Sequence, residues 1–178
     1  GKHPIEKIQL FKNLLNSKCE INNKQVVEYW YKAQRSYIQK NYPINQYKIQ
    51  EIDQVFLSIK EIQKNQSVKV VALTANEQEQ AKWLLQYAQV LQYFDDVVGY
   101  DLSNQQIFKT KVELMANYLK QNQFDPKIMI GDGIPDMIAG KQNNCICLGI
   151  GHDLLNNGAD FAFTEGIEYD QLSQKIRD

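Results

Sequence analysis

The sequence lacks a charge excess of either sign, because its 20 Lys and Arg residues oppose 21 Asp and Glu residues and give a formal net charge of −1. Nucleic-acid and membrane-surface binding usually require a basic face, so this balance argues against both classes of function. The sequence also lacks any run of about 18 apolar residues, and no signal-peptide pattern opens it. We therefore expect a soluble protein without membrane insertion. Its 178 residues suffice for one domain with a full core, with or without a small subdomain.

Cysteine is scarce, with three residues at Cys19, Cys145 and Cys147. Cys145 and Cys147 stand two apart in an apolar run. In a strand this spacing puts both side chains on one face, where they are poorly placed for a mutual disulfide. No zinc-ligand spacing is present. We therefore expect buried free thiols and a reducing compartment, either the cytoplasm or an organelle matrix.

The first part of the chain contains helical periodicity and no convincing strand. Apolar side chains recur at helical spacing over residues 4–16, over 22–40 and again over 49–62. We assign no role to the many Gln and Asn residues on helical faces. The expected division is a helical region over residues 1–62 and a core over residues 63–178.

From residue 67 onward, short apolar runs rich in β-branched residues alternate with helical patterns. Such alternation is typical of right-handed βαβ units, and it predicts an α/β fold with a parallel sheet covered by helices on both faces. Ligands bind such sheets at the carboxyl ends of the strands, so we expect a functional site at that edge. The predicted strands are residues 68–73, 97–99, 128–130, 145–150 and 161–163, and the clearest helices are residues 77–91 and 110–120.

Two aspartates follow the strand predicted at residues 128–130. Asp132 lies between two glycines in a turn, and Asp136 lies just inside a helix whose start is marked by Pro135. Two carboxylates at the ligand-binding edge suit a hard cation such as Mg²⁺. A purely structural alternative is that Asp132 shapes the turn and Asp136 caps the helix.

Two further groups are predicted at the same edge. The first predicted strand ends in Thr74-Ala75-Asn76, where the Thr74 hydroxyl and a following backbone N–H suit an anion at a helix N-terminus. Lys111 opens a predicted helix and can reach back over the edge as a fixed positive charge. The structural alternatives are an ordinary N-cap for Thr74 and a solvated charge for Lys111.

Taken in order along the chain from Asp53 to its end, these motifs resemble those of the haloacid dehalogenase (HAD) superfamily of phosphohydrolases. Thr74 in VVALTAN resembles the family's phosphate-binding hydroxyl, and Lys111 in FKTKVELMANYL resembles its catalytic lysine. In GDGIPD, Asp132 matches a metal ligand and Asp136 matches the supporting catalytic acid. The resemblance implies a three-layer Rossmann-like sheet with a small N-terminal helical cap. It also implies a Mg²⁺ cofactor and a phosphorylated small molecule as substrate.

The family's first motif is missing from this sequence. Family members carry Asp-x-Asp-x-Thr or Val on a first, central strand, where the leading Asp is the nucleophile and the second Asp the general acid/base. No such run precedes the helices here, so the aspartyl-phosphate route has no nucleophile. Burial of a central strand of about five apolar residues would contribute roughly 10 kcal/mol, which is comparable with the stability of a whole domain. We therefore do not expect its position in the sheet to stand empty.

Two hypotheses for the function follow, and the sequence leaves enzymatic activity open between them. In the first, the chain is part of a longer enzyme, a Mg²⁺-dependent HAD-type phosphatase whose first strand lies upstream of Gly1. In the second, the chain is a non-catalytic HAD-like binding or scaffold subunit of a protein complex. A partner strand or the chain's own N-terminal residues would then fill the central position. A nucleotide-binding Rossmann domain is disfavoured, because no Gly-x-Gly-x-x-Gly turn follows a first strand.

Overall fold

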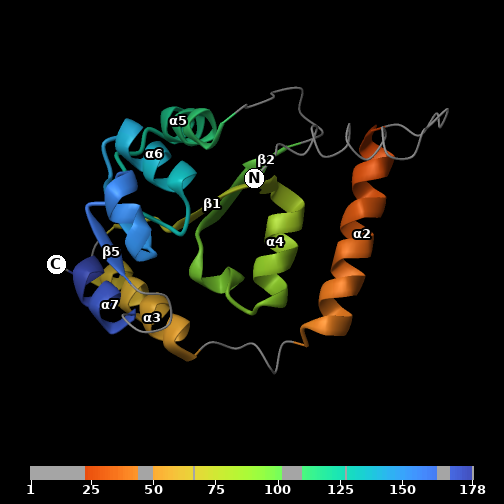
Figure 1. The fold of residues 1–178 in the computed structure, drawn as a ribbon, viewed down its shortest axis with the longest axis horizontal. Coiled ribbons are helices and arrows are strands. Elements are labelled where there is room, and N and C mark those ends of the chain that lie inside the picture. Colours follow the sequence, from red (N-terminus) through yellow and green to blue (C-terminus); the bar gives the residue numbers. More distant parts are fainter. Residues whose placement is uncertain are drawn as a thin grey trace. The chain divides into compact units, whose positions relative to one another are not determined.

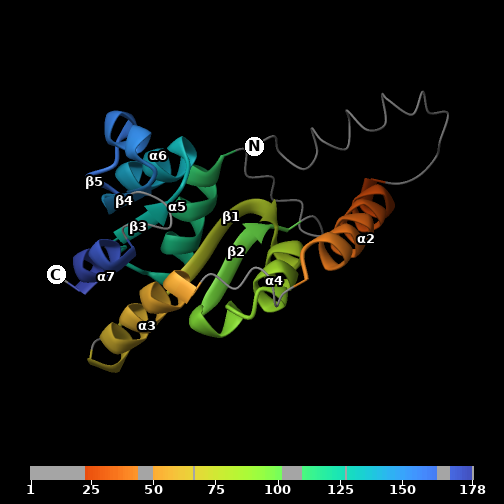
Figure 2. The same cartoon turned by 60° about the horizontal axis from the view of Figure 1, so that its bottom comes forward.

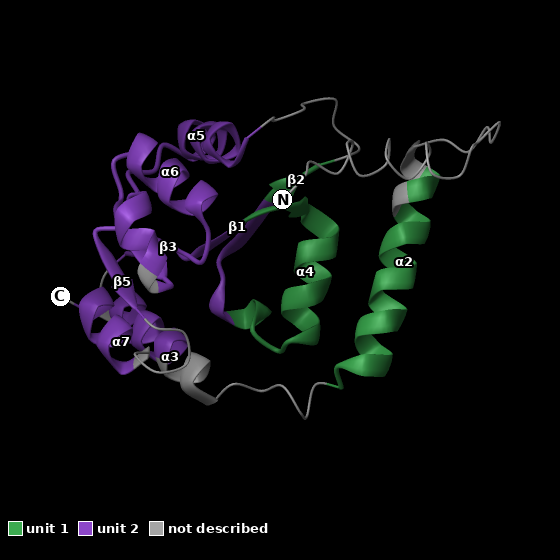
Figure 3. Ribbon diagram, viewed as in Figure 1, with its two compact units in different colours: residues 1–48, 74–92, 99–107 green, residues 49–73, 93–98, 108–178 purple. Residues whose placement is uncertain are grey.

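The chain forms two compact units (Figure 3). The first contains the described residues of 1–48, 74–92 and 99–107, and the second contains those of 49–73, 93–98 and 108–178. The helix predicted over residues 4–16 and Cys19 lie outside the described residues. The division into residues 1–62 and 63–178 stays a prediction. The computed structural model describes residues 23–43, 50–65, 67–101, 110–126, 128–163 and 169–177.

The alternation of strands and helices predicted from residue 67 onward is confirmed (Figure 1). Across the described residues, no helix combines the length and the apolar character that crossing a membrane requires. In chain order the elements are α2 (Asn23–Asn41), α3 (Gln50–Asn65), β1 (Val71–Glu77), α4 (Gln78–Tyr87), η2 (Leu91–Tyr93), β2 (Asp96–Tyr100), α5 (Lys111–Asn122), β3 (Ile128–Gly131), α6 (Ile134–Gln142), β4 (Ile146–Ile150), η3 (His152–Asn157), β5 (Phe161–Phe163) and α7 (Tyr169–Arg177).

β1 extends further than the sequence predicts. The expected strand covers residues 68–73 and ends in Thr74-Ala75-Asn76, whereas β1 begins at Val71 and continues through Glu77. β1 forms a two-stranded sheet with β2. A side chain at Gly99 of β2 would come within 2.7 Å of the Asn76 carbonyl oxygen, so the two backbones approach closely there. Pairing with β2 therefore explains why β1 includes the polar residues that follow Leu73.

The second unit contains a parallel sheet in the order β3-β4-β5. Ile128 of β3 lies opposite Ile146 of β4, and Leu148 of β4 lies opposite Phe161 of β5. Successive side chains of a strand point to opposite faces, so Cys147 and Leu148 of the central strand face different layers. Both are almost fully buried, with 0% and 1% of their surface exposed. A parallel sheet covered on both sides has this burial pattern.

Helices cover both faces of the β3-β4-β5 sheet (Figure 2). One face packs against α5 and α6, and the other packs against α3 and α7. This is the predicted three-layer α/β arrangement, so the fold class is confirmed. The first core includes Met115, Met129, Met137 and Cys147, and the second includes Leu148, Phe163 and Leu172.

The predicted single sheet is divided in two within the described residues. β1 pairs with β2, whereas β3 pairs with β4. None of the described strands pairs with both β1 and β3. The described part of β3 is therefore paired along one edge only.

The described part of the first unit has a polar contact between α2 and α4. Gln80, with 1% of its surface exposed, accepts a hydrogen bond from Arg35 Nε at 2.7 Å and donates one to Gln34 Oε1 at 3.1 Å. The Arg35 guanidinium lies 5.1 Å from the centroid of the Trp83 ring, which stacks on Tyr87. Gln80, to which we assigned no role from the sequence, is thus the buried centre of the helix contact, and the exposed Gln34 pairs with it.

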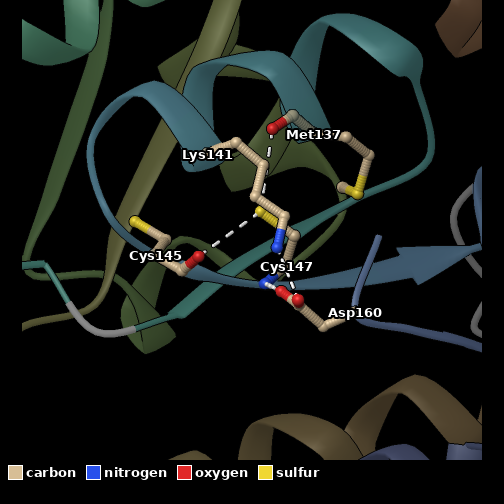
Figure 4. A network of polar contacts seen from close by, with 5 residues as sticks. All are labelled: Met137, Lys141, Cys145, Cys147 and Asp160. Carbon is tan, nitrogen blue, oxygen red and sulfur yellow. Dashed lines mark hydrogen bonds and ion pairs between the residues drawn. The ribbon is translucent and has the colours of Figure 1, made fainter. Parts of the chain in front are cut away.

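Cys145 and Cys147 carry free thiols, and both are buried, as predicted. The Cys147 Sγ atom lies 3.7 Å from the carbonyl oxygens of Met137 and Cys145 (Figure 4). Burial raises the pKa of the Cys145 thiol to about 11, and burial also raises the pKa of Cys147. Because the thiolate is the reactive form, we expect both groups to be inert at neutral pH.

Asp160 links β4 to the start of β5 by hydrogen bonds. Its Oδ2 atom accepts a hydrogen bond from the Cys147 N–H at 2.7 Å, and its Oδ1 atom lies 2.5 Å from Lys141 Nζ (Figure 4). The Asp160 N–H donates in return to the Cys147 carbonyl oxygen at 2.8 Å. The Cys147 N–H and the Lys141 ammonium together lower the pKa of the Asp160 carboxyl group from its usual value.

Candidate active site

The turn from β3 into α6 places the two predicted aspartates differently. Asp132 follows the last residue of β3 and is exposed, whereas Asp136 lies in the first turn of α6 and is only 6% exposed. The Asp136 Oδ2 atom accepts a hydrogen bond from the Gly133 N–H at 3.2 Å, which satisfies one donor at the start of the helix. Asp136 thus takes the structural role of a cap, but this hydrogen bond uses only one of its two oxygens.

Lys111 pairs with the other oxygen of Asp136. Lys111 is the first residue of α5, whose start is fixed by the Thr110 hydroxyl, which accepts a hydrogen bond from the Glu113 N–H at 3.2 Å. The Lys111 ammonium contacts Asp136 Oδ1, and the two side chains are only 15% and 8% exposed. Lys111 is therefore an internal charge held by a carboxylate, and the alternative of a solvated charge is wrong.

Gly131 makes room for this ion pair. A Cβ atom at Gly131 would lie 2.4 Å from the Asp136 Cβ and 2.6 Å from its Cγ. Both distances are shorter than any non-bonded contact and would be a steric clash. The absence of a side chain at the end of β3 therefore lets the Asp136 carboxylate lie against the strand. We did not single out Gly131 for this role from the sequence. The available signal was a glycine between an apolar strand and an aspartate.

The exposed Asp132 carboxylate fits a hard cation. Its side chain has no hydrogen-bond or ion-pair partner among the described residues, and those residues contain no group of three or more His, Cys, Asp or Glu that could hold a metal. Mg²⁺ retains several waters and is usually held by one or two carboxylates together with substrate oxygens, so an incomplete protein shell is compatible with it. Asp132 would be one ligand, while the Asp136 carboxylate is held by Lys111.

Thr74, Ala75 and Asn76 belong to the first unit and lie within β1. The Thr74 hydroxyl accepts a hydrogen bond from the Asn76 N–H at 3.1 Å. The cap of α4 is Glu77, whose carboxylate accepts a hydrogen bond from the Gln80 N–H at 2.8 Å, so the alternative of Thr74 as the N-cap is wrong. That these three residues bind the same ligand as Lys111 and Asp132 stays a prediction.

The sequence profile of haloacid dehalogenase-like hydrolases matches residues 5–150, which include the helices before β1. Several solved structures are similar to the chain. A protein described as a predicted phosphatase from Clostridium acetobutylicum has a TM-score of 0.64 and 22% identity, over 99% of this chain and 78% of that one. A β-phosphoglucomutase from Clostridium difficile has a TM-score of 0.61 and 16% identity, over 98% and 78% of the two chains. A HAD phosphatase from Thermococcus onnurineus has a TM-score of 0.56 and 17% identity, over 92% and 69%.

At these identities the structural similarities establish the fold alone. No curated protein matches the chain in sequence. The family profile, in contrast, spans more than half of the 178 residues. The chain belongs to the haloacid dehalogenase-like hydrolase family.

Proposed function

We propose that this chain carries the phosphate-binding and Mg²⁺-binding groups of a HAD-type phosphate monoester hydrolase. The observation that supports the proposal most directly is the buried pair of Lys111 and Asp136 beside the exposed carboxylate of Asp132. A buried ion pair contributes little to stability compared with an apolar replacement, so its presence at a strand end favours a functional role.

Each residue has a distinct part in this proposal. Asp132 supplies a carboxylate oxygen to Mg²⁺, and the ion when bound neutralises phosphate charge. The Asp136 carboxylate holds the Lys111 ammonium in one position, so that a fixed positive charge is available to the phosphate group. Thr74, with the backbone N–H groups of Ala75 and Asn76, supplies further hydrogen bonds to phosphate oxygens.

Binding measurements test this assignment without requiring turnover. Mg²⁺ and inorganic phosphate are titrated into the protein by calorimetry, using the wild type, Asp132→Asn and Thr74→Val. We expect Asp132→Asn to weaken Mg²⁺ binding and Thr74→Val to weaken phosphate binding. Asp153→Asn removes an exposed aspartate of η3 and is the matched control, with no expected effect. Undiminished Mg²⁺ binding by Asp132→Asn would contradict the metal assignment.

The alternative function is that of a non-catalytic HAD-like binding or scaffold subunit. The observation that favours it is that these 178 residues contain no Asp-x-Asp motif. Hydrolysis of an aryl phosphate with Mg²⁺ separates the two functions. Turnover by the wild type that is abolished in Asp132→Ala would exclude the alternative. Failure to bind either Mg²⁺ or phosphate would instead exclude the hydrolase proposal.

A further inference from the structure

Arg35 of α2 is held in one position by two contacts that do not neutralise its charge. Its Nε atom donates a hydrogen bond to the buried amide oxygen of Gln80 at 2.7 Å, and its guanidinium lies 5.1 Å from the centroid of the Trp83 ring. Gln80 is itself fixed by its second hydrogen bond, which it donates to Gln34. A neutral amide and an aromatic ring orient a guanidinium without supplying a counter-charge. Arg35 is therefore a preorganised cation.

The two terminal nitrogen atoms of Arg35 are open. Among the described residues, neither Nη1 nor Nη2 has a hydrogen-bond or ion-pair partner, and the side chain is only partly buried. A guanidinium binds a carboxylate or a phosphate through two parallel N–H donors, and the pair of donors at its end is unused here. The two acidic residues at the start of α4 do not fill it. Glu77 caps the helix, and Glu79 pairs with Lys82.

Arg35 lies beside the segment to which we assign phosphate binding. α2 runs alongside α4 (Figure 1), and Gln80 lies in the first turn of α4, just after residues 74–76. One turn before Arg35, the Tyr31 hydroxyl contacts the backbone of Glu77, which directly follows this segment. Residues four apart on a helix share a face, so one face of α2 meets the start of α4. All of these residues belong to the first unit.

Tyr31 adds a neutral hydrogen-bond donor to the same face of α2. Burial raises the pKa of its hydroxyl group to about 12, so the group stays protonated at neutral pH. A protonated phenol can donate a hydrogen bond to an anion, whereas a phenolate would repel it. The α2 face therefore presents a fixed cation and a neutral donor next to residues 74–76, and both suit a negatively charged ligand.

We propose that Arg35 binds a second anionic group of the substrate, a carboxylate or a further phosphate, while the phosphate ester lies at residues 74–76. This inference rests on the proposed function, because Thr74 holds the first phosphate. A ligand with two anionic groups needs two separate sets of donors, and Arg35 supplies a set that the candidate phosphate site does not use. Because the guanidinium is already fixed by Gln80 and Trp83, little conformational entropy is lost on binding. The substrate class is therefore a small phosphate ester with a second negative charge.

Three phosphate esters of similar length test the proposal on the full 178-residue chain, by calorimetry in the presence of Mg²⁺. Glycerol 3-phosphate ends in a neutral hydroxymethyl group, 3-phosphoglycerate ends in a carboxylate, and propane-1,3-diol bisphosphate ends in a second phosphate. We expect each doubly anionic ester to bind roughly tenfold or more tightly than glycerol 3-phosphate, because its second anion gains charge-assisted hydrogen bonds. The tighter of the two identifies the anion that Arg35 prefers.

Substitutions of Arg35 assign this preference to its guanidinium. Arg35→Gln is expected to reduce the difference among the three esters to about twofold or less, with binding of glycerol 3-phosphate unchanged. Arg35→Lys keeps the positive charge but lacks the two parallel donors, so it should retain only part of the preference. The matched control is Lys32→Gln, which removes an exposed cation of the same helix and has no expected effect.

The possible failures are distinguishable. Equal binding of all three esters by the wild type would overturn the inference and leave the proposed function standing. A preference that survives Arg35→Gln would overturn it as well. Equal weakening of all three esters in Arg35→Gln would show that Arg35 has a structural role alone, which also excludes the inference. If neither the esters nor inorganic phosphate bound to the wild type, the proposed function would fail first and the inference with it.

Discussion

The α2–α4 contact of the first unit and the sheet core of the second are stabilised by different interactions. The first is centred on Gln80, a buried amide that hydrogen-bonds Gln34 and Arg35. The second is centred on apolar side chains such as Met137 and Cys147, both 0% exposed. Hydrogen bonds depend on donor and acceptor geometry and contribute about 1 kcal/mol each, whereas a packed apolar core depends on volume and is sensitive to each added or removed atom.

The ion pair of Lys111 and Asp136 is the exception within the second unit. It puts two charges at the border of an apolar core, where breaking the pair is costly although forming it contributes little. The comparison therefore separates a polar contact that organises two helices from a polar pair that is retained at a candidate active site.

The largest effect is expected from Gly131→Ala. The new methyl group would collide with the Asp136 Cβ at 2.4 Å, so the carboxylate must leave its position against β3 and its contact with Lys111. We expect a loss of about 4 kcal/mol in the free energy of unfolding, measured by urea denaturation. The control is Gly133→Ala, whose Cβ would have no neighbour closer than 3.4 Å. Equal stability of the two variants would contradict the steric argument.

Removing the cation alone tests the ion pair without a steric clash. Lys111→Met leaves the Asp136 carboxylate buried without its partner, and we expect a loss of about 3 kcal/mol. The double variant Lys111→Met with Asp136→Asn is expected to recover part of this loss, because no uncompensated charge remains. Urea denaturation of both variants provides the values. Lys120→Met on the exposed last turn of α5 should change stability by less than about 0.5 kcal/mol. An effect of Lys111→Met as small as that of the control would show that the pair is not structurally coupled.

In the first unit, Gln80→Met preserves the approximate side-chain volume and removes both hydrogen bonds. We expect a loss of about 1 to 2 kcal/mol, because Arg35 Nε loses its acceptor and Gln34 loses its donor. Hydrogen exchange of the α4 amides measures the effect locally. The exposed Gln86 of the same helix provides the control variant Gln86→Met. If Gln80→Met were neutral, the α2–α4 contact would depend on volume, and the contrast between the units would disappear.

The smallest effect concerns Asp160, whose pKa in the folded state is lowered from 3.8. A lowered pKa means that the stabilisation is present above about pH 3.8 and is lost as the pH falls through the folded-state pKa. At neutral pH we expect the free energy of unfolding of the wild type to exceed that of Asp160→Asn by less than about 1 kcal/mol, because the pair with Lys141 is partly exposed. The difference should shrink in acid, as measured by urea denaturation across pH. Asp153→Asn is the control, and a difference that grows in acid would contradict the assignment.

Much of the second unit could be predicted from the sequence. The apolar run before Asp132 and the proline near the start of α6 predicted β3, its turn and the following helix at nearly their observed positions. Strand and helix periodicity is a local property, so it is readable without the fold. β1 covers Val71–Glu77 and not the expected residues 68–73, because its bounds depend on pairing with β2, whose residues lie about 20 positions away in the chain.

Local sequence patterns were enough to identify the family, the order of strands and helices, and the positions of Lys111, Asp132 and Asp136 at the ends of their elements. The folded structure was needed to show that Lys111 and Asp136 pair across 25 residues, that Gly131 makes room for them, and that Gln80 is the buried centre of a helix contact. It also decided that β1 and β3 belong to separate sheets among the described residues. Each of these depends on contacts between segments far apart in the chain, which no local pattern encodes.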